Sequence, residues 1–244
     1  MIQTIYILWF QGFEHAPGLV KQCCLSWKHY NPDWNIVLLD KSNLHEYVQL
    51  EDYIDLSGKN INFTALSDVV RLCLLRKHGG VWADATTFCN RPLNDWLPAY
   101  IKEGFFAFNR PKPGPKNIVR LLAPWFLYAD KDSYIIEKWL DSTIRYFSIH
   151  DSPQDYYWVH FLFGDLCAAD QAFKAIWDKV PKLPANGVGP HYIQEKGMFR
   201  TINDKIKEDI RKKITPLYKL TYKCNFVKHD ETLVLYYLYS TIRN

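Results

Sequence analysis

The chain has 244 residues, enough to bury the core of one domain, and its hydrophobic (48%) and charged (23%) fractions are ordinary for a globular protein. Its net charge of +4 is too small to indicate nucleic-acid binding, although it suits an anionic substrate. No apolar run approaches the roughly 20 residues of a membrane span, and the N-terminus lacks the basic lead-in of a signal peptide. The six cysteines form no C-x-x-C pair, so nothing supports a zinc or redox site. We therefore expect a cytosolic protein with reduced thiols.

The first forty residues predict a β-α-β unit. Residues 2–10 are mainly β-branched and aromatic, which indicates a buried strand. Residues 15–30 carry their apolar side chains on one helical face, and residues 34–39 predict a second strand. Such a unit is typical of an α/β protein with a parallel sheet.

A helix, a glycine pair and a short strand follow. The helix is predicted over residues 64–77 and ends at a Gly-Gly pair, because glycine tolerates the left-handed conformation that terminates helices. Residues 81–83 then predict a short strand that places Asp84 at its carboxyl end.

The remaining segments predict further strands and a mainly helical C-terminal region, with no internal repeat and no clear domain boundary. We expect one domain over residues 1–244. Residues 87–89 are expected to continue or restart the strand over 81–83, and a further strand is expected over 105–109. Residues 125–128 fit a strand or a loop. Helices are expected over 134–147, 156–166, 168–180 and 201–214, and residues 233–239 fit a strand or a helix. Irregular segments are expected over 41–62, 111–117 and 183–197.

Asp84 is a candidate for chemistry, since ligands of open α/β sheets gather at the carboxyl ends of strands. A carboxylate at that place can hold Mg²⁺ or Mn²⁺ through oxygen. The ion could bridge to a diphosphate and stabilise it as a leaving group. The alternative is an aspartate that only caps a turn.

Asp68 and Arg71 lie three residues apart on the predicted helix and therefore share a face. If partly buried, the pair could accept sugar hydroxyls and position a phosphate through two hydrogen bonds. On the surface it would be an ion pair of little energetic value.

The combination of these features is more specific than any one of them. Residues 67–84 contain S-D-x-x-R, then G-G, then V-W-A-D, and this pattern resembles the donor site of glycosyltransferases with the GT-A fold. It is most similar to capsular polysaccharide synthesis proteins and to the related initiating mannosyltransferases and sugar-transferring toxins of family 32. The opening ILWFQG and the stretch HYNPDWNIVLLD also resemble that family, so the resemblance covers about the first hundred residues.

The resemblance implies a GT-A fold with a mixed, mostly parallel sheet flanked by helices. It also implies transfer of a sugar from a UDP- or GDP-sugar, with retention of the anomeric configuration. Asp68 and Arg71 would contact the donor sugar, and Asp84 would hold Mn²⁺ or Mg²⁺. The second acid of the family's D-x-D motif is Thr86 here, whose neutral hydroxyl is a weaker metal ligand. His229 is a candidate for a further ligand from the C-terminal region.

Other donor contacts are expected near both ends of the chain. Trp9 would stack on the nucleotide base, with Gln11 beside it, unless Trp9 belongs to the core. The segment YKLTYK resembles a K-L-T-x-K stretch of the family. On an extended strand Lys219, Thr221 and Lys223 would point the same way, toward the diphosphate. An edge strand protected by lysines is the alternative.

The acceptor is expected to bind beside the aromatic segment that begins at Asp155. This carboxylate would orient an acceptor hydroxyl, and Tyr157, His160 and Trp125 would line the acceptor pocket. The alternative is an aromatic core helix with a polar cap.

The two halves of the chain therefore have different expected roles. Residues 1–110 form the nucleotide-sugar half, and residues 111–244 form the half that receives an oligosaccharide or lipid-linked saccharide. The basic helix over 201–214 is expected to face solvent, and contact with anionic lipid is the alternative. Two other functions stay open. One is an inactive module that binds sugar nucleotides or glycans, in which Thr86 would be tolerated. The other is a sugar-phosphate nucleotidyltransferase, although this sequence lacks the glycine-rich basic loop with which such enzymes usually bind a triphosphate.

Overall fold

The central sheet has five strands in the order β2-β1-β3-β6-β5 in the computed structural model, which describes residues 1–110 and 119–242. β1 pairs in parallel with β2 and β3, whereas β6 runs antiparallel to both of its neighbours, β3 and β5. The predicted α/β class with a mixed, mostly parallel sheet is therefore confirmed. The strands span Thr4–Leu8 (β1), Asn35–Leu39 (β2), Gly80–Ala83 (β3), Phe105–Asn109 (β5) and Leu122–Ala129 (β6).

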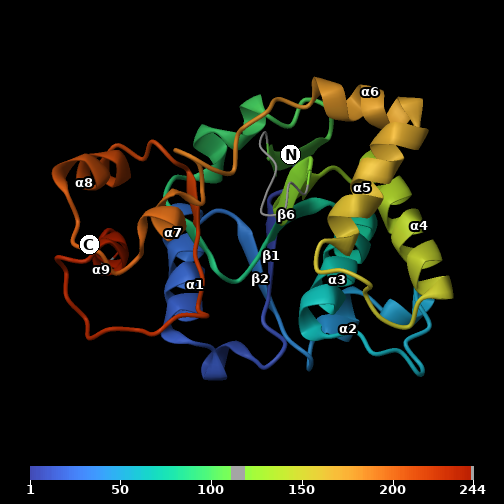
Figure 1. The fold of residues 1–244 in the computed structure, drawn as a ribbon, viewed down its shortest axis with the longest axis horizontal. Helices are drawn as coiled ribbons and strands as arrows, with labels where there is room; N and C mark the ends of the chain where they lie inside the picture. Colours follow the sequence, from blue (N-terminus) through green and yellow to red (C-terminus); the bar gives the residue numbers. More distant parts are fainter. Residues whose placement is uncertain (111–118, 243–244) are drawn as a thin grey trace.

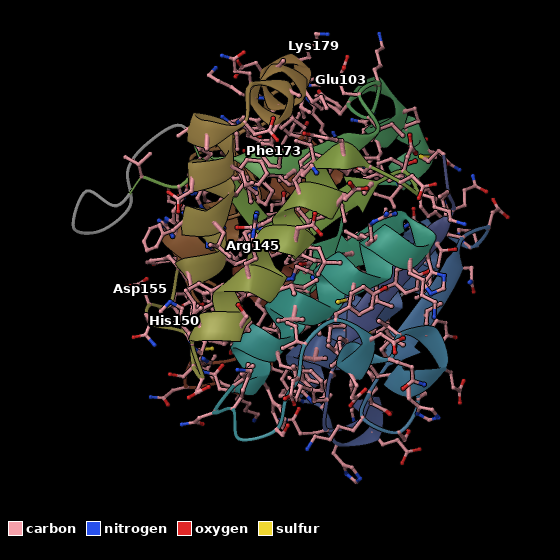
Figure 2. The ribbon with its side chains drawn as sticks, turned by 90° about the vertical axis from the view of Figure 1, so that its right-hand side faces the viewer. Glu103, Arg145, His150, Asp155, Phe173 and Lys179 are labelled. Carbon is pink, nitrogen blue, oxygen red and sulfur yellow. The ribbon has the colours of Figure 1, made fainter. Side chains whose placement is uncertain are left out.

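Helices cover the sheet on two sides (Figure 1). One side carries α3, α4 and α5, which pack against one another in that order, followed by α6. Figure 2 looks onto this helical side. α1 lies on the other side of the sheet. The helices span Gly18–Tyr30 (α1), Phe63–His78 (α3), Tyr134–Ile149 (α4), Trp158–Ala169 (α5) and Gln171–Lys179 (α6).

A second, two-stranded sheet joins the middle of the chain to its C-terminal region. β4 (Thr87–Cys89) pairs antiparallel with β7 (Leu217–Lys219), and Thr87 lies opposite Lys219. α7 (Tyr192–Lys196), α8 (Asp204–Arg211) and α9 (Val234–Ser240) lie on the α1 side of the molecule (Figure 1). Their apolar side chains, together with those of α1, β4 and β7, form a hydrophobic cluster separate from the main core, with members that include Leu19, Cys23, Phe88, Ile206, Ile210, Tyr218, Leu235 and Tyr239.

Steric crowding requires glycine at both positions of the pair that follows α3. The side chain of Asn62 caps the start of α3 by accepting from the Ala65 N–H, and Gly79 ends the helix with a φ of 66°. A Cβ on Gly79 would lie 2.6 Å from the backbone nitrogen of Lys131, and one on Gly80 (φ 97°) would lie 2.8 Å from the Thr4 carbonyl oxygen. Only glycine fits both positions, so the sharp turn that starts β3, and with it the placement of Asp84, depends on this pair.

Several predicted boundaries were wrong in the C-terminal half. The segment 183–197 contains the short helix α7 rather than loop alone. The helix predicted over 201–214 covers only Asp204–Arg211, and Ile214 beyond it is 58% exposed. β7 ends at Lys219, so residues 218–223 do not form one extended strand.

Other segments follow the predictions more closely. Residues 125–128 form part of strand β6, and residues 233–239 are mainly the helix α9. The irregular segment 41–62 contains the single helical turn α2 (Leu44–Tyr47), and the loop predicted over 111–117 lies outside the described residues. Short 3₁₀ helices span Phe13–His15, Leu50–Asp52, Leu93–Asp95 and Leu97–Ala99.

All six cysteines are free thiols. Across residues 1–110 and 119–242, none of the helices combines the length and apolar character needed to cross a membrane.

Candidate active site

A cavity of about 780 Å³ lies where β1, β3 and β5 end and β6 begins. This is the edge of the sheet at which ligands of open α/β folds are expected. The structure brings together there twelve of the residues predicted from the sequence, namely Trp9, Gln11, Asp68, Arg71, Asp84, Thr86, Trp125, Tyr157, His160, Lys219, Thr221 and Lys223. Asp155 and His229 do not line this cavity.

Asp84 is held by three donors. Its Oδ1 accepts from the Trp82 indole N–H at 2.9 Å and from Arg71 Nη2 at 3.3 Å, and its Oδ2 accepts from Lys219 Nζ at 2.7 Å. Burial by itself would raise the pKa of Asp84, but the charges of Lys219 and Arg71 outweigh it and hold the pKa below its usual value. The carboxylate is therefore ionised at neutral pH and fixed in place, with 26% of the side chain exposed to the cavity.

Arg71 is the centre of the network. Its guanidinium, with 4% of the side chain exposed, lies 2.7 Å from the carboxylate of Asp68 and also donates from Nη1 to the Pro124 carbonyl at 3.1 Å. The predicted surface alternative for this pair is therefore wrong. Burial raises the pKa of Asp68 to about 6; Arg71 opposes this shift and the nearby Asp84 adds to it.

Lys219 reaches the site through the β4–β7 pairing. Its ammonium lies 2.7 Å from Asp84 Oδ2 and 2.7 Å from Thr86 Oγ1, although 135 residues separate it from Asp84. Thr221 and Lys223 also line the cavity, but they follow the end of β7. The three side chains therefore share the cavity without forming the extended strand that the sequence predicted.

These residues do not fit a divalent cation held by the protein. Lys219 takes the position between Asp84 and Thr86 where the predicted Mn²⁺ or Mg²⁺ would bind. The third predicted ligand, His229, is exposed, and its ring contacts that of Tyr236 with ring centroids 4.5 Å apart and an interplanar angle of 48°. Within the described residues, no group of three or more His, Cys, Asp and Glu side chains could hold a metal.

Trp9 is half-buried, and its ring meets the edge of Tyr222 at a centroid distance of 5.2 Å. Trp9 follows β1 and lines the cavity, so part of its ring can receive a flat ligand. Gln11, in the same turn, is exposed to the cavity. Tyr222 also lines the cavity, and the sequence analysis did not single it out.

Asp155 does not line the main cavity with the other predicted acceptor residues. Its carboxylate accepts from the backbone N–H of Tyr157 at 2.6 Å, which makes it a turn residue before α5. It borders a separate cavity of about 370 Å³, together with Tyr156 and Lys223. Figure 2 shows Asp155 at the margin of the molecule, near the end of α4 that His150 marks.

Arg110, Arg120 and His191 also line the cavity, although they were not among the residues predicted from the sequence. Arg110 directly follows β5, in the position that Asp84 has after β3. That signal was present in the sequence, since residues 105–109 were predicted as a strand. No motif marked Arg120 or His191.

Comparison with known proteins places this arrangement in a family. A sequence model of capsular polysaccharide synthesis proteins matches residues 1–239. The chain belongs to this family. The chain is also 25% identical to O-glycosyltransferase braB of Annulohypoxylon truncatum over 159 residues. The match covers 57% of this chain and 36% of braB, so the chain spans about a third of the length of that curated relative.

Among solved structures, this family member is similar to the PaToxG glycosyltransferase. The TM-score is 0.47 with 14% sequence identity, and the alignment covers 72% of this chain and 73% of PaToxG.

Proposed function

We propose that this protein is a glycosyltransferase that moves a sugar from a nucleotide-diphosphate donor to a saccharide acceptor in the synthesis of a surface or capsular polysaccharide. The observation that carries the proposal is the network of Asp68, Arg71, Asp84 and Lys219, which lies in one cavity at the carboxyl ends of the strands. Membership of the capsular polysaccharide synthesis family and the similarity to a protein named as an O-glycosyltransferase support it.

In this proposal the donor takes one orientation along the cavity. The nucleotide base, from a UDP- or GDP-sugar, stacks on Trp9, and the diphosphate lies near the ammonium of Lys219. The transferred sugar then lies toward Asp68 and Arg71, where the Asp68 carboxylate can accept hydrogen bonds from the sugar hydroxyl groups. Arg71 cannot move freely because Ser67 and Pro124 also fix its guanidinium. The donor sugar therefore meets rigid groups, which favours a defined geometry for reaction.

The chemistry is charge stabilisation at the leaving group. The bond between the anomeric carbon and the diphosphate oxygen breaks, and the acceptor hydroxyl oxygen forms its bond on the same face. The departing phosphate oxygen takes the acceptor proton, so the products are a retained glycoside and a nucleoside diphosphate. Lys219 stabilises the negative charge that grows on the diphosphate during this step.

The acceptor approaches from the side of β6 and α5. Trp125, Tyr157 and His160 line that part of the cavity. An oligosaccharide or a lipid-linked saccharide could lie against these aromatic rings. Asp155 has no part in this proposal because it borders the other cavity.

The test is transfer or hydrolysis with a panel of UDP- and GDP-sugars, measured as release of the nucleoside diphosphate. Asp84→Ala should lower kcat/KM by at least about 100-fold, since it removes the group that positions Lys219 and Arg71. Lys207→Met, an exposed change on α8, is the matched control for a surface substitution. Turnover by Asp84→Ala at the wild-type rate would reject the assigned role.

The same panel separates the other two functions. Binding of a sugar nucleotide by calorimetry, without turnover on any acceptor, would identify an inactive binding module. Pyrophosphate release from a nucleoside triphosphate and a sugar 1-phosphate would identify a nucleotidyltransferase.

A further inference from the structure

Two arginines, Arg120 buried and Arg110 partly buried, lie together at the end of the cavity formed by the β5–β6 hairpin. Arg110 follows β5 and Arg120 precedes β6, and the Arg110 N–H donates to the Leu121 carbonyl at 3.2 Å. Both side chains line the cavity, together with His160 and His191. We call Arg110, Arg120, His160 and His191 the arginine cluster.

The positive charge of this cluster is not balanced. Within residues 1–110 and 119–242, neither Arg110 nor Arg120 forms an ion pair. The segment 111–118 between them contains no Asp or Glu. Glu195 also lines the cavity, but its carboxylate accepts from Asn186. Burial and the charge of Arg120 lower the pKa of Arg110, and the weaker effect of Glu195 does not offset them.

The cluster also contains polar atoms without partners. The Nε atoms of both arginines, the indole Nε1 of Trp125 and the Nδ1 of His160 are buried and have no hydrogen-bond partner. Arg120 is the clearest case, since it is only 6% exposed. Buried donors without acceptors are rare because they lose their bonds to water without replacement. The arginine side chains that carry such atoms line the cavity, so their guanidinium groups indicate a ligand that supplies acceptor oxygens.

The surrounding side chains fix the arginines but do not add charge. The guanidinium of Arg120 lies 4.2 Å from the ring centroid of Tyr157, and Arg110 Nη2 lies 3.1 Å from His191 Nε2. Burial and the nearby arginines lower the pKa of His160 to about 3 and that of His191 to about 4. Both histidines are therefore neutral near pH 7, and the arginines alone supply the positive charge.

We propose that the arginine cluster binds an anionic group, a carboxylate or a phosphate, carried by the saccharide acceptor. Planar guanidinium groups match the paired oxygens of both anions. The assignment to the acceptor rests on the proposed function, in which Lys219, on β7, serves the donor diphosphate. The two arginines of the cluster flank the β5–β6 connection, and the cluster contacts Trp125 and Tyr157, which are proposed to belong to the acceptor side of the cavity.

The experiment measures binding by calorimetry in the absence of any sugar-nucleotide donor. The probes are methyl β-glucuronide, glucose 6-phosphate and methyl β-glucoside, which carry a carboxylate, a phosphate and no charge. Wild-type protein should bind at least one anionic probe ten times more tightly than methyl β-glucoside, and the stronger of the two identifies the anion. Arg120→Gln and Arg110→Gln should each weaken binding of the anionic probe by about tenfold and so abolish its preference over methyl β-glucoside. Both variants should bind UDP with the affinity of the wild type. Arg145→Gln, on the outer face of α4 (Figure 2), is the matched control.

Three results would overturn the proposal. The wild type could show no preference for either anion, the glutamine variants could keep the preference, or they could weaken UDP binding as strongly as binding of the anionic probes. The last result would place the donor diphosphate on the arginines. Arg120→Lys keeps the charge and loses the planar fork, and it serves as the test if Arg120→Gln does not fold. Because no turnover is measured, failure of the glycosyltransferase proposal would leave these results interpretable.

Discussion

The two ends of the cavity differ in how their charges are balanced. At the donor end Arg71 lies between Asp68 and Asp84, and Lys219 pairs with Asp84. At the acceptor end Arg110 and Arg120 have no carboxylate partner within the described residues. A network in which acidic and basic side chains pair with one another holds its geometry before a ligand binds. Arginines without a carboxylate partner form ion pairs only when an anionic ligand binds. The first arrangement suits positioning for chemistry, and the second suits selection of a charged substrate.

The largest expected effect is a difference in the free energy of unfolding between the variants Arg71→Met and Arg120→Met. Arg71→Met leaves Asp68 buried without its partner, which should lower the free energy of unfolding by about 3–5 kcal/mol. Arg120→Met removes a charge that repels Arg110 and a buried donor without an acceptor, so stability should change by less than about 1 kcal/mol or increase. Urea unfolding followed by circular dichroism measures both. Equal losses in the two variants would contradict the difference in charge balance.

Lys219 should show a smaller effect, on activity. Lys219→Met removes the cation nearest the diphosphate, and kcat/KM should fall by about 10–100-fold. The change also leaves Asp84 Oδ2 and Thr86 Oγ1 without the ammonium that lies between them. Added Mn²⁺ should therefore stimulate the variant more than the wild type.

Kinetic assays with and without Mn²⁺ measure these effects, with Lys207→Met as the control for loss of a surface charge. Full activity of Lys219→Met in the presence of EDTA would show that Lys219 does not stabilise the leaving group.

The pH dependence should also differ between the two ends. Asp68 has a pKa of about 6, so donor-side activity should fall by about tenfold for each pH unit below 6 as its carboxylate gains a proton. His160 and His191, with pKa values of about 3 and 4, keep their neutral form from pH 5 to 8. Binding of methyl β-glucuronide, whose carboxylate stays ionised over this range, should therefore show no histidine titration from pH 5 to 8. Rate and calorimetric profiles over pH 5–8 test this, and a change near pH 6 in both would contradict it.

Asp68 should also affect stability in a defined direction. Its carboxyl titrates near 3.9 in an unfolded chain and near 6 in the folded protein, so the folded state holds the proton more tightly. The contribution of Asp68 to the free energy of unfolding is therefore fully present below about pH 4 and declines as the pH rises to 6. Asp68→Asn should remove this part of the pH dependence, which urea unfolding at several pH values would measure. An unchanged profile in Asp68→Asn would assign the dependence to other groups.

How much the sequence predicted depends on the distance along the chain between the groups involved. Asp68, Arg71 and Asp84 belong to one helix–turn–strand segment, so local periodicity and the glycine pair were enough to place them. Lys219 was expected only from the family resemblance, because its position depends on the pairing of β4 with β7. Periodicity within one segment gives no information about such long-range pairing.

The arginine cluster could not be predicted for a different reason. Arg110 and Arg120 are distinguished by buried Nε atoms that have no hydrogen-bond acceptor. Whether an acceptor lies nearby is decided only when the neighbouring elements have packed around them. The boundary errors have a similar origin. The spacing of Ile202, Ile206, Ile210 and Ile214 extended the predicted helix to residue 214, but the helix ends at Arg211 and Ile214 is exposed, so this last isoleucine does not pack with the others.

The pairing of β4 with β7 also bears on synthesis of the protein. The ribosome releases Asp84 long before it releases Lys219, and the apolar contacts of α8 and α9 that hold β7 come from the last part of the chain. A nascent chain would thus carry the aspartate without its lysine. The enzyme should acquire activity only after residues 204–240 have been translated, which would keep shorter nascent chains from consuming activated sugars.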